Sequence, residues 1–303
     1  MPPEAYERLT RALVDLIPAE RLIRDPLHRL AYGTDASFYR LIPELVVKIE
    51  SEQELSRLLA LARTHATPVT FRGAGTSVSG QALSDSVLVM LGDNWRGLEV
   101  SADRARIRVQ PGVLGGRANR ALAPFHRKLG PDPASINICT IGGIAANNSR
   151  GMCCRTSEDS YHTLVDMRLM LADGTLVDTA DAASRRAFAQ SHRGLLGALD
   201  AVAARTRTNF ALAARIREKF SIRNTSGYCL NALLDFDDPI DILQHLMIGS
   251  EGTLGFIAEI TYRTVPEHAH KASALVYFPT IEVACDAVTA LKPTPVSAVE
   301  RID

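Results

Sequence analysis

The feature that most constrains the fold is a strand–helix–strand pattern that leads directly into a glycine-rich segment. Residues 45–49 form a mainly apolar run, and residues 69–71 form a second strand-like run. Between them, Ser51 and Glu54 have the spacing of a capping box, which predicts the start of a helix. A βαβ unit of this kind indicates an α/β sheet and places residues 72–80 at the end of its second strand.

The segment after that strand is made of small residues with one cation. It consists of Arg72, Gly73, Ala74, Gly75, Thr76, Ser77, Val78, Ser79 and Gly80. Backbone N–H groups of such a loop can wrap a phosphate or pyrophosphate. The GxGxxG fingerprint fails because Val78 occupies its third glycine position, and the P-loop fails because Gln81 stands where its lysine belongs. Two interpretations of this segment stay open. It is either a pyrophosphate-binding loop without a cation directly on the pyrophosphate or a plain glycine-rich turn.

Two further glycine-rich segments follow in the chain. Residues 130–148 combine prolines, hydroxyls and a glycine pair before a helix of small residues. Residues 248–257 form a glycine-studded turn that enters a strand. Small side chains let the backbone approach a flat ligand closely. Each segment alone is weak evidence, but three in one chain favour a ligand site over a purely structural role.

The remaining pattern predicts alternating strands and helices. Asp173-Gly174, within residues 164–177, is a strong hairpin signal. Asp238-Pro239 predicts the start of a helix that ends near Gly249. We also expect strands at 87–91, 105–110, 255–265 and 274–278, and helices within 1–30, at 116–122, as two segments in 183–217, and at 281–291.

Composition excludes several classes of protein. Lys plus Arg and Asp plus Glu number 34 each, so the net charge is zero, which argues against nucleic acid as the main partner. The chain has no run of about 18 apolar residues, and its charged N-terminus lacks the pattern of a signal peptide. These features predict a cytoplasmic protein without a transmembrane segment, and they leave a peripheral position at the inner membrane open.

Cysteines and histidines form no recognisable metal motif. The five cysteines include no CxxC pair, which argues against a disulfide framework and against zinc or iron–sulfur ligands. We interpret Cys153 and Cys154 as small loop residues, because a vicinal disulfide is strained. His268 and His270 are better explained as a solvated strand end than as metal ligands. No metal site is therefore predicted.

Four segments together carry a resemblance to a known family. Residues 43–47, 72–76, 131–143 and 249–255 resemble the flavin-binding domain of the FAD-linked oxidases of the vanillyl-alcohol oxidase and p-cresol methylhydroxylase type. The segments 219–228 and 245–247 are similar to the long bacterial D-2-hydroxyglutarate or D-lactate dehydrogenases, which carry FAD plus an iron–sulfur domain.

This resemblance implies an α+β fold made of two α/β subdomains. Residues 1–42 would be a helical lead-in, residues 43–268 the FAD-binding domain, and residues 269–303 the beginning of a truncated cap domain. The cofactor would be non-covalent FAD, because no histidine for covalent attachment lies between His65 and His126. The implied FAD-binding residues are Arg72, Gly73, Ala74, Gly75, Thr76, Ser77, Ser79, Gly80, Pro131, Asp132, Pro133, Ser135, Thr140, Gly142, Gly143, Asn147, Asn148, Glu251, Gly252 and Ile257.

The sequence departs from the family where catalysis would be expected. Residues 1–303 contain no GHxGDGNxH-like motif and no CxxCxxC motif, so no catalytic residue is assigned and any iron–sulfur cluster would lie downstream. Tyr32, Asp35 and Arg40 match the family lead-in, for which packing is the favoured role. We expect a fragment that binds FAD but does not itself oxidise a 2-hydroxy acid. A non-catalytic flavin-binding module and another oxidase of the superfamily stay open, and the electron acceptor is not indicated.

Overall fold

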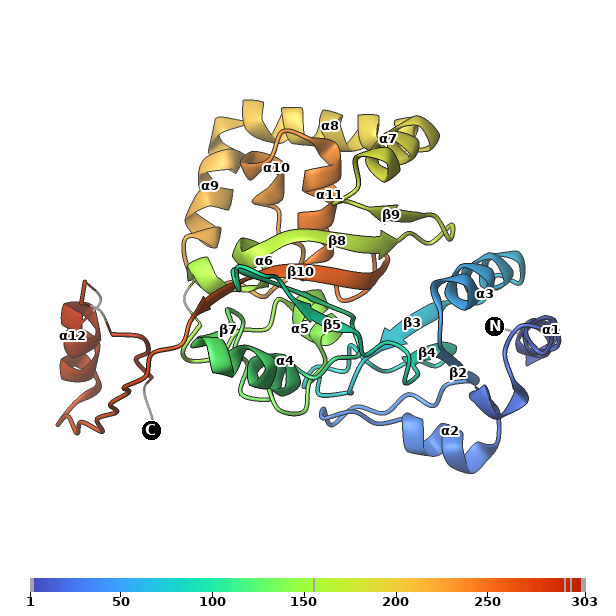
Figure 1. The fold of residues 1–303 in the computed structure, drawn as a ribbon, viewed down its shortest axis with the longest axis horizontal. Coiled ribbons are helices and arrows are strands. Elements are labelled where there is room, and N and C mark those ends of the chain that lie inside the picture. Colours follow the sequence, from blue (N-terminus) through green and yellow to red (C-terminus); the bar gives the residue numbers. More distant parts are fainter. Residues whose placement is uncertain (1–2, 155, 292, 295, 301–303) are drawn as a thin grey trace.

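The computed structural model describes residues 3–154, 156–291, 293–294 and 296–300. Two β-sheets, each with its own apolar core, are flanked by helices (Figure 1). The architecture is α+β, which confirms the predicted fold class. We call the part built on strands β1–β4 the first subdomain and the part built on β5–β10 the second subdomain.

The first subdomain contains a four-stranded sheet in the order β1-β2-β4-β3. Its strands are β1 (Leu22–Ile23), β2 (Leu45–Ile49), β3 (Val69–Arg72) and β4 (Val87–Leu91). β4 lies between β2 and β3 and is parallel to both, whereas β1 is antiparallel to β2. The carboxyl ends of three parallel strands therefore meet at one edge, which is where ligands bind in open α/β sheets.

Helices α1 (Pro3–Leu13) and α3 (Glu52–Thr64) share the core of this sheet. The predicted cap of α3 is present, because the N–H of Glu54 donates to Ser51 Oγ at 3.1 Å. The return bond differs from a standard capping box: the Glu54 carboxylate accepts from the N–H of Glu50 at 2.7 Å. The same carboxylate also pairs with Arg21 at 2.7 Å, which ties the N-terminal segment to α3.

The first helix is shorter than the N-terminal pattern predicts. α1 ends at Leu13, and a 3-10 turn η1 (Ala19–Arg21) and β1 separate it from α2 (Pro26–Tyr32). Asp25 begins α2 because its carboxylate accepts the N–H of Leu27 at 3.0 Å, with proline at the first helical position. Through β1, this segment becomes an edge strand of the first sheet.

The second subdomain contains an antiparallel sheet centred on one long strand, β10 (Phe256–Pro266). β10 pairs with β6, β7 and β8, so it connects segments from distant parts of the chain. The predicted hairpin is confirmed as β8 and β9, with Gly174 at φ +86° in its turn. The other strands are β5 (Leu98–Val100), β6 (Arg106–Val109), β7 (Arg127–Leu129), β8 (Leu164–Met170) and β9 (Leu176–Asp178).

Helices lie on both sides of this sheet, with α7–α11 above it and α4 and α5 below it in Figure 1. Residues 182–220 form three helices where two were expected, because the chain breaks at His192 and Asn209. The second-subdomain helices are α4 (Gly115–Leu122), α5 (Ile141–Asn147), α6 (Ser160–Thr163), α7 (Ala182–Ser191), α8 (Arg193–Thr208), α9 (Phe210–Phe220), α10 (Ala232–Asp235) and α11 (Pro239–Met247), with 3-10 turns η2 (Ala123–Phe125) and η3 (Thr156–Glu158).

The segment after β10 stands apart from both sheets (Figure 1). The helix expected at 281–291 is confirmed as α12 (Ile281–Leu291), although none of its residues is buried. The strand expected at 274–278 is wrong, because these residues pair with no neighbouring strand to complete their backbone hydrogen bonds. Within the described ranges, no helix is both long enough and apolar enough to cross a membrane.

Candidate functional site

The three glycine-rich segments come together although they are far apart in sequence. We call residues 73–80 the first loop, 130–148 the second loop and 248–255 the third loop. One carboxylate joins them: Glu251 Oε1 accepts from Asn147 Nδ2 at 2.6 Å and from Gln81 Nε2, directly after the first loop, at 3.4 Å. The fold therefore brings the three glycine-rich segments together at Glu251.

Backbone contacts fix the second and third loops against each other. The N–H groups of Gly249 and Glu251 donate to the carbonyls of Ala145 and Ala146 at 3.0 and 2.8 Å. Glu251 adopts φ +53°, a left-handed conformation that is uncommon for a non-glycine residue. Burial raises the pKa of Glu251, while the hydrogen bonds from Asn147 and Gln81 lower it. Its carboxyl group is thus held by amides and serves as the junction of the loops.

The first loop presents a row of unused hydrogen-bond donors. In the part of the chain that the structure describes, none of the backbone N–H groups from Gly73 to Val78 donates to a protein acceptor. The loop instead uses a carbonyl, since Gly75 O accepts the N–H of Ala36 at 3.0 Å. A row of free N–H groups at the carboxyl edge of a parallel sheet is the arrangement that binds phosphate oxygens.

Two buried hydroxyls in the second and third loops also lack partners among the described residues. Among the described residues, Thr140 Oγ1 in the second loop and Ser250 Oγ in the third have no hydrogen-bond acceptor or donor. Buried polar atoms are nearly always paired, so unpaired ones at one site indicate a missing ligand or water. Gly73 lies so close to Thr140 that a Cβ on this glycine would overlap Thr140 Oγ1. Both the free donors and the close approach fit a bound dinucleotide.

A cavity of about 290 Å³ opens beside the first loop. It adds residues that sequence reasoning missed, in particular Arg96 and Arg117. The available signal was the position of Gly92 and Arg96 just after β4, at the same sheet edge as the first loop. The cavity is lined by Gly73, Ala74, Leu91, Gly92, Arg96, Gly112, Leu114, Arg117 and Thr140.

Some predicted residues face away from this cavity. Arg72 donates to the carbonyl of Tyr32 at 3.1 Å, and burial lowers the pKa of its guanidinium. Ile257 is 6% exposed and belongs to the core of the second subdomain. Asn148 is buried, with its amide directed to Asp159 at 3.3 Å. A Cβ on Gly252 would lie at ordinary van der Waals distance from Phe71.

The rest of the second loop turns toward the chain that follows it. Asp132 pairs with Lys128 at 3.5 Å. A Cβ on Gly151 would overlap the carbonyl of Asp132, so the two backbones are in close contact. Pro131 and Pro133 are buried on either side of Asp132. This half of the second loop is therefore held in place by Lys128 and by the backbone at Gly151.

A segment of the lead-in, residues 32–40, lies across the first loop. Besides the bonds of Tyr32 O and the Ala36 N–H, the ring of Tyr39 lies 3.1 Å from the position of a Cβ on Gly80. Asp35 has one buried carboxylate oxygen without a partner among the described residues, whereas Arg40 is exposed. This segment therefore braces the first loop from outside.

A buried polar cluster stands directly behind the second loop. Asp159, fully buried, pairs with Arg150 and accepts from the N–H of His162 at 2.8 Å and from its Nδ1 at 2.7 Å. The Arg150 side chain is only 5% exposed. Since Asn148 also donates to Asp159, the cluster anchors the C-terminal end of α5, which begins at the second loop's glycine pair.

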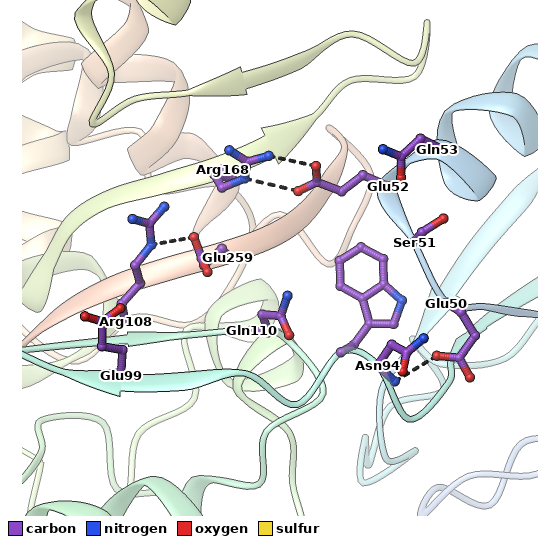
Figure 2. A pocket seen from close by; sticks show the side chains of 11 residues that line it. Glu50, Ser51, Glu52, Gln53, Asn94, Glu99, Arg108, Gln110, Arg168 and Glu259 are labelled. Carbon is purple, nitrogen blue, oxygen red and sulfur yellow. Dashed lines mark hydrogen bonds and ion pairs between the residues drawn. The ribbon is translucent and has the colours of Figure 1, made fainter.

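A second cavity of about 490 Å³ lies at the seam of the two subdomains (Figure 2). Its charged groups are largely paired: Arg168 holds both oxygens of Glu52 at 3.1 and 2.7 Å, and Arg108 pairs with Glu259 at 2.5 Å. Glu50 accepts the N–H of Asn94 at 2.8 Å. This seam thus connects α3 and β2 with β6, β8 and β10, and offers no unpaired buried polar atom to a ligand.

His245, one helical turn before the third loop, predicts a loss of stability in acid. Its ring stacks on Phe236 at 3.8 Å and its Nδ1 donates to the carbonyl of Asp241 at 2.7 Å. Burial lowers the pKa of His245 from its ordinary value of 6.5. Asp241 and Asp235 act in the opposite direction and raise this pKa, but burial has the larger effect.

Because the unfolded chain takes up this proton first, the free energy of unfolding should fall as pH drops through the unfolded value of 6.5. Urea unfolding at about pH 7.5 and about pH 5.5 measures the effect, and His245→Gln should flatten it. His28→Gln, at a side chain 67% exposed, is the control. An unchanged pH slope in His245→Gln would contradict this assignment.

Comparison with known proteins finds relatives of this chain. The family described as "FAD binding domain" matches residues 43–180, which include the first loop and the second loop. A D-2-hydroxyglutarate dehydrogenase from Pantoea ananatis is 29% identical over 246 residues, covering 78% of this chain and 24% of the relative. These matches support the predicted resemblance to the FAD-linked oxidases. The cofactor of this chain is FAD, which confirms the predicted cofactor.

Other similar proteins share only part of their length with this chain. The glycolate oxidase subunit GlcD of Escherichia coli is 32% identical over 166 residues, covering 54% of this chain and 33% of the relative. The solved structure of an alkyldihydroxyacetonephosphate synthase superposes with a TM-score of 0.62 at 19% identity, covering 95% of this chain and 46% of that one. This chain therefore spans less than half of each of these proteins, and the structural match shows the fold alone.

Proposed function

We propose that this chain is the FAD-binding portion of a flavin-dependent dehydrogenase for a D-2-hydroxy acid, either D-2-hydroxyglutarate or D-lactate. The observation that carries the proposal is the row of N–H groups from Gly73 to Val78 without a protein acceptor among the described residues, with the unpaired hydroxyl of Thr140 close to Gly73. Dehydrogenase relatives named for D-2-hydroxyglutarate and D-lactate support the substrate class.

The residues of this chain bind and orient the cofactor in this proposal. The first loop holds the pyrophosphate through its N–H groups, and the second and third loops, joined at Glu251, border the rest of FAD. FAD, when bound, supplies the acceptor for a hydride from the carbon that bears the substrate hydroxyl. We keep the domain division proposed from the sequence. In it, residues 43–268 form the FAD-binding domain and residues 269–303 begin a cap domain.

The first test is whether purified residues 1–303 bind FAD without a covalent bond. Acid precipitation should release yellow flavin into the supernatant. Flavin retained in the pellet would refute non-covalent binding, and absence of any bound flavin would refute the function itself.

The second test concerns the substrate class and uses the gene product that contains this chain. D-2-hydroxyglutarate or D-lactate should bleach the flavin absorbance under anaerobic conditions, whereas the L enantiomers should not. Residues 1–303 alone should bind FAD and stay oxidised, because they contain no substrate clamp or histidine motif of the family. Bleaching by glycolate only would instead support another oxidase of the superfamily.

A further inference from the structure

The cavity beside the first loop has an uneven distribution of charge. Its lining includes two arginines, Arg96 and Arg117, and no carboxylate. It also contains Gly73 and Ala74, whose N–H groups are free among the described residues, and the unpaired hydroxyl of Thr140. Thr140 is 9% exposed, so a buried, unpaired polar group lines a cavity with a positive rim.

The guanidinium of Arg72 packs against Gly75 of the first loop, with its Nε unpaired among the described residues, but it lies outside this cavity. Arg72 is turned toward the lead-in, where it donates to Tyr32 O and lies near Asp35. On the cavity side of the first loop, the cations that can balance the charge of a diphosphate are therefore Arg96 and Arg117.

Arg96 and Arg117 come from different elements and support each other. Arg96 lies in the turn after β4, and Arg117 lies in the first turn of α4. Arg117 Nη1 donates to the carbonyl of Arg96 at 3.1 Å, while Arg96 pairs with the exposed carboxylate of Asp93 at 2.7 Å. Both side chains are thus brought to the cavity rim by contacts that leave further N–H donors on each guanidinium.

The backbone of α4 does not provide the positive end of a helix here. The N–H groups of Gly115 and Gly116 donate to the carbonyls of Cys139 and Ile136 at 3.1 and 2.7 Å. With these first donors occupied, positive charge at this rim comes from side chains.

We propose that Arg96 and Arg117 neutralise the diphosphate of FAD that the first loop binds. This inference rests on the proposed function, because it takes FAD as the occupant of the first loop. The two kinds of group have different roles in this proposal. Backbone N–H groups set the position of the diphosphate, and the two guanidinium groups balance its charge.

The test measures the dissociation constant of FAD for the double variant Arg96→Gln/Arg117→Gln, by quenching of flavin fluorescence across a range of salt concentrations. At low salt the Kd should rise roughly tenfold, as expected for two partly exposed charge contacts. The difference should shrink at high salt, because mobile ions screen exposed charges. Arg120→Gln, on the same helix but outside the cavity lining, should leave the Kd unchanged.

Each outcome separates this inference from the proposed function. If the wild-type chain binds FAD and the double variant binds it equally well at low salt, the inference is wrong and the proposed function stands. A loss of affinity of the same size at every salt concentration would indicate a structural defect and would also overturn the inference. Failure of the wild-type chain to bind FAD would refute the proposed function, and this inference with it.

Discussion

Gly73→Val is expected to weaken FAD binding by about a hundredfold. A Cβ at this position overlaps Thr140 Oγ1, so the Thr140 side chain or the loop that carries it must shift. Overpacking at such a contact costs about 3 kcal/mol, which corresponds to about a hundredfold in Kd. Flavin fluorescence quenching measures the change, and circular dichroism checks that the variant is folded.

A matched glycine and a milder variant keep this prediction testable. Gly197→Ala places its Cβ in open space on α8, so FAD affinity should not change. Thr140→Val removes only the unpaired hydroxyl, and should lower FAD affinity about fivefold while leaving the stability of the flavin-free protein unchanged or higher. Wild-type affinity in both Gly73→Val and Thr140→Val would rule out this side of the first loop as the FAD site.

Asp159→Ala is expected to lower the free energy of unfolding by about 3–5 kcal/mol, because it leaves the Arg150 guanidinium buried without its counter-charge. Such a loss is a large part of the stability of an ordinary domain. It also removes the acceptor of Asn148 and His162, so α5 and the second loop should loosen. Urea unfolding of the flavin-free protein measures the effect.

The control for this prediction is an ion pair at the surface. Asp237 pairs with Arg207 at 3.1 Å but is 99% exposed, so Asp237→Ala should leave the urea midpoint unchanged within error. Asp159→Asn, which keeps an acceptor but removes the charge, should fall between wild type and Asp159→Ala. Equal urea midpoints for Asp159→Ala and Asp237→Ala would show that the buried pair does not stabilise the fold.

Local chemistry was enough to predict most elements, whereas the identity of the cofactor came from the resemblance to the FAD-linked oxidases. Ser51 and Asp238 cap their helices with side-chain oxygens, as their spacing indicates. Gly174 adopts the positive φ that the hairpin turn requires. These signals are readable because the interacting atoms are only a few residues apart, so no distant contact is needed to form them. The glycine-rich segments likewise carried the resemblance to the FAD-linked oxidases.

Tertiary structure decided everything that depends on a distant partner. Residues 274–278 have the pattern of a strand but form none, because a strand needs a neighbour to receive its hydrogen bonds and the pattern cannot supply one. The Arg72 side chain turns to Tyr32 rather than to the cavity, since its direction is set by packing 40 residues away in sequence. Arg96 and Arg117 meet because the segment after β4 contacts the first turn of α4, a juxtaposition with no local signal in either segment. Sequence alone thus determined which loops bind FAD in this proposal, and only the fold decided which charges face it, because loop composition is local and side-chain convergence is not.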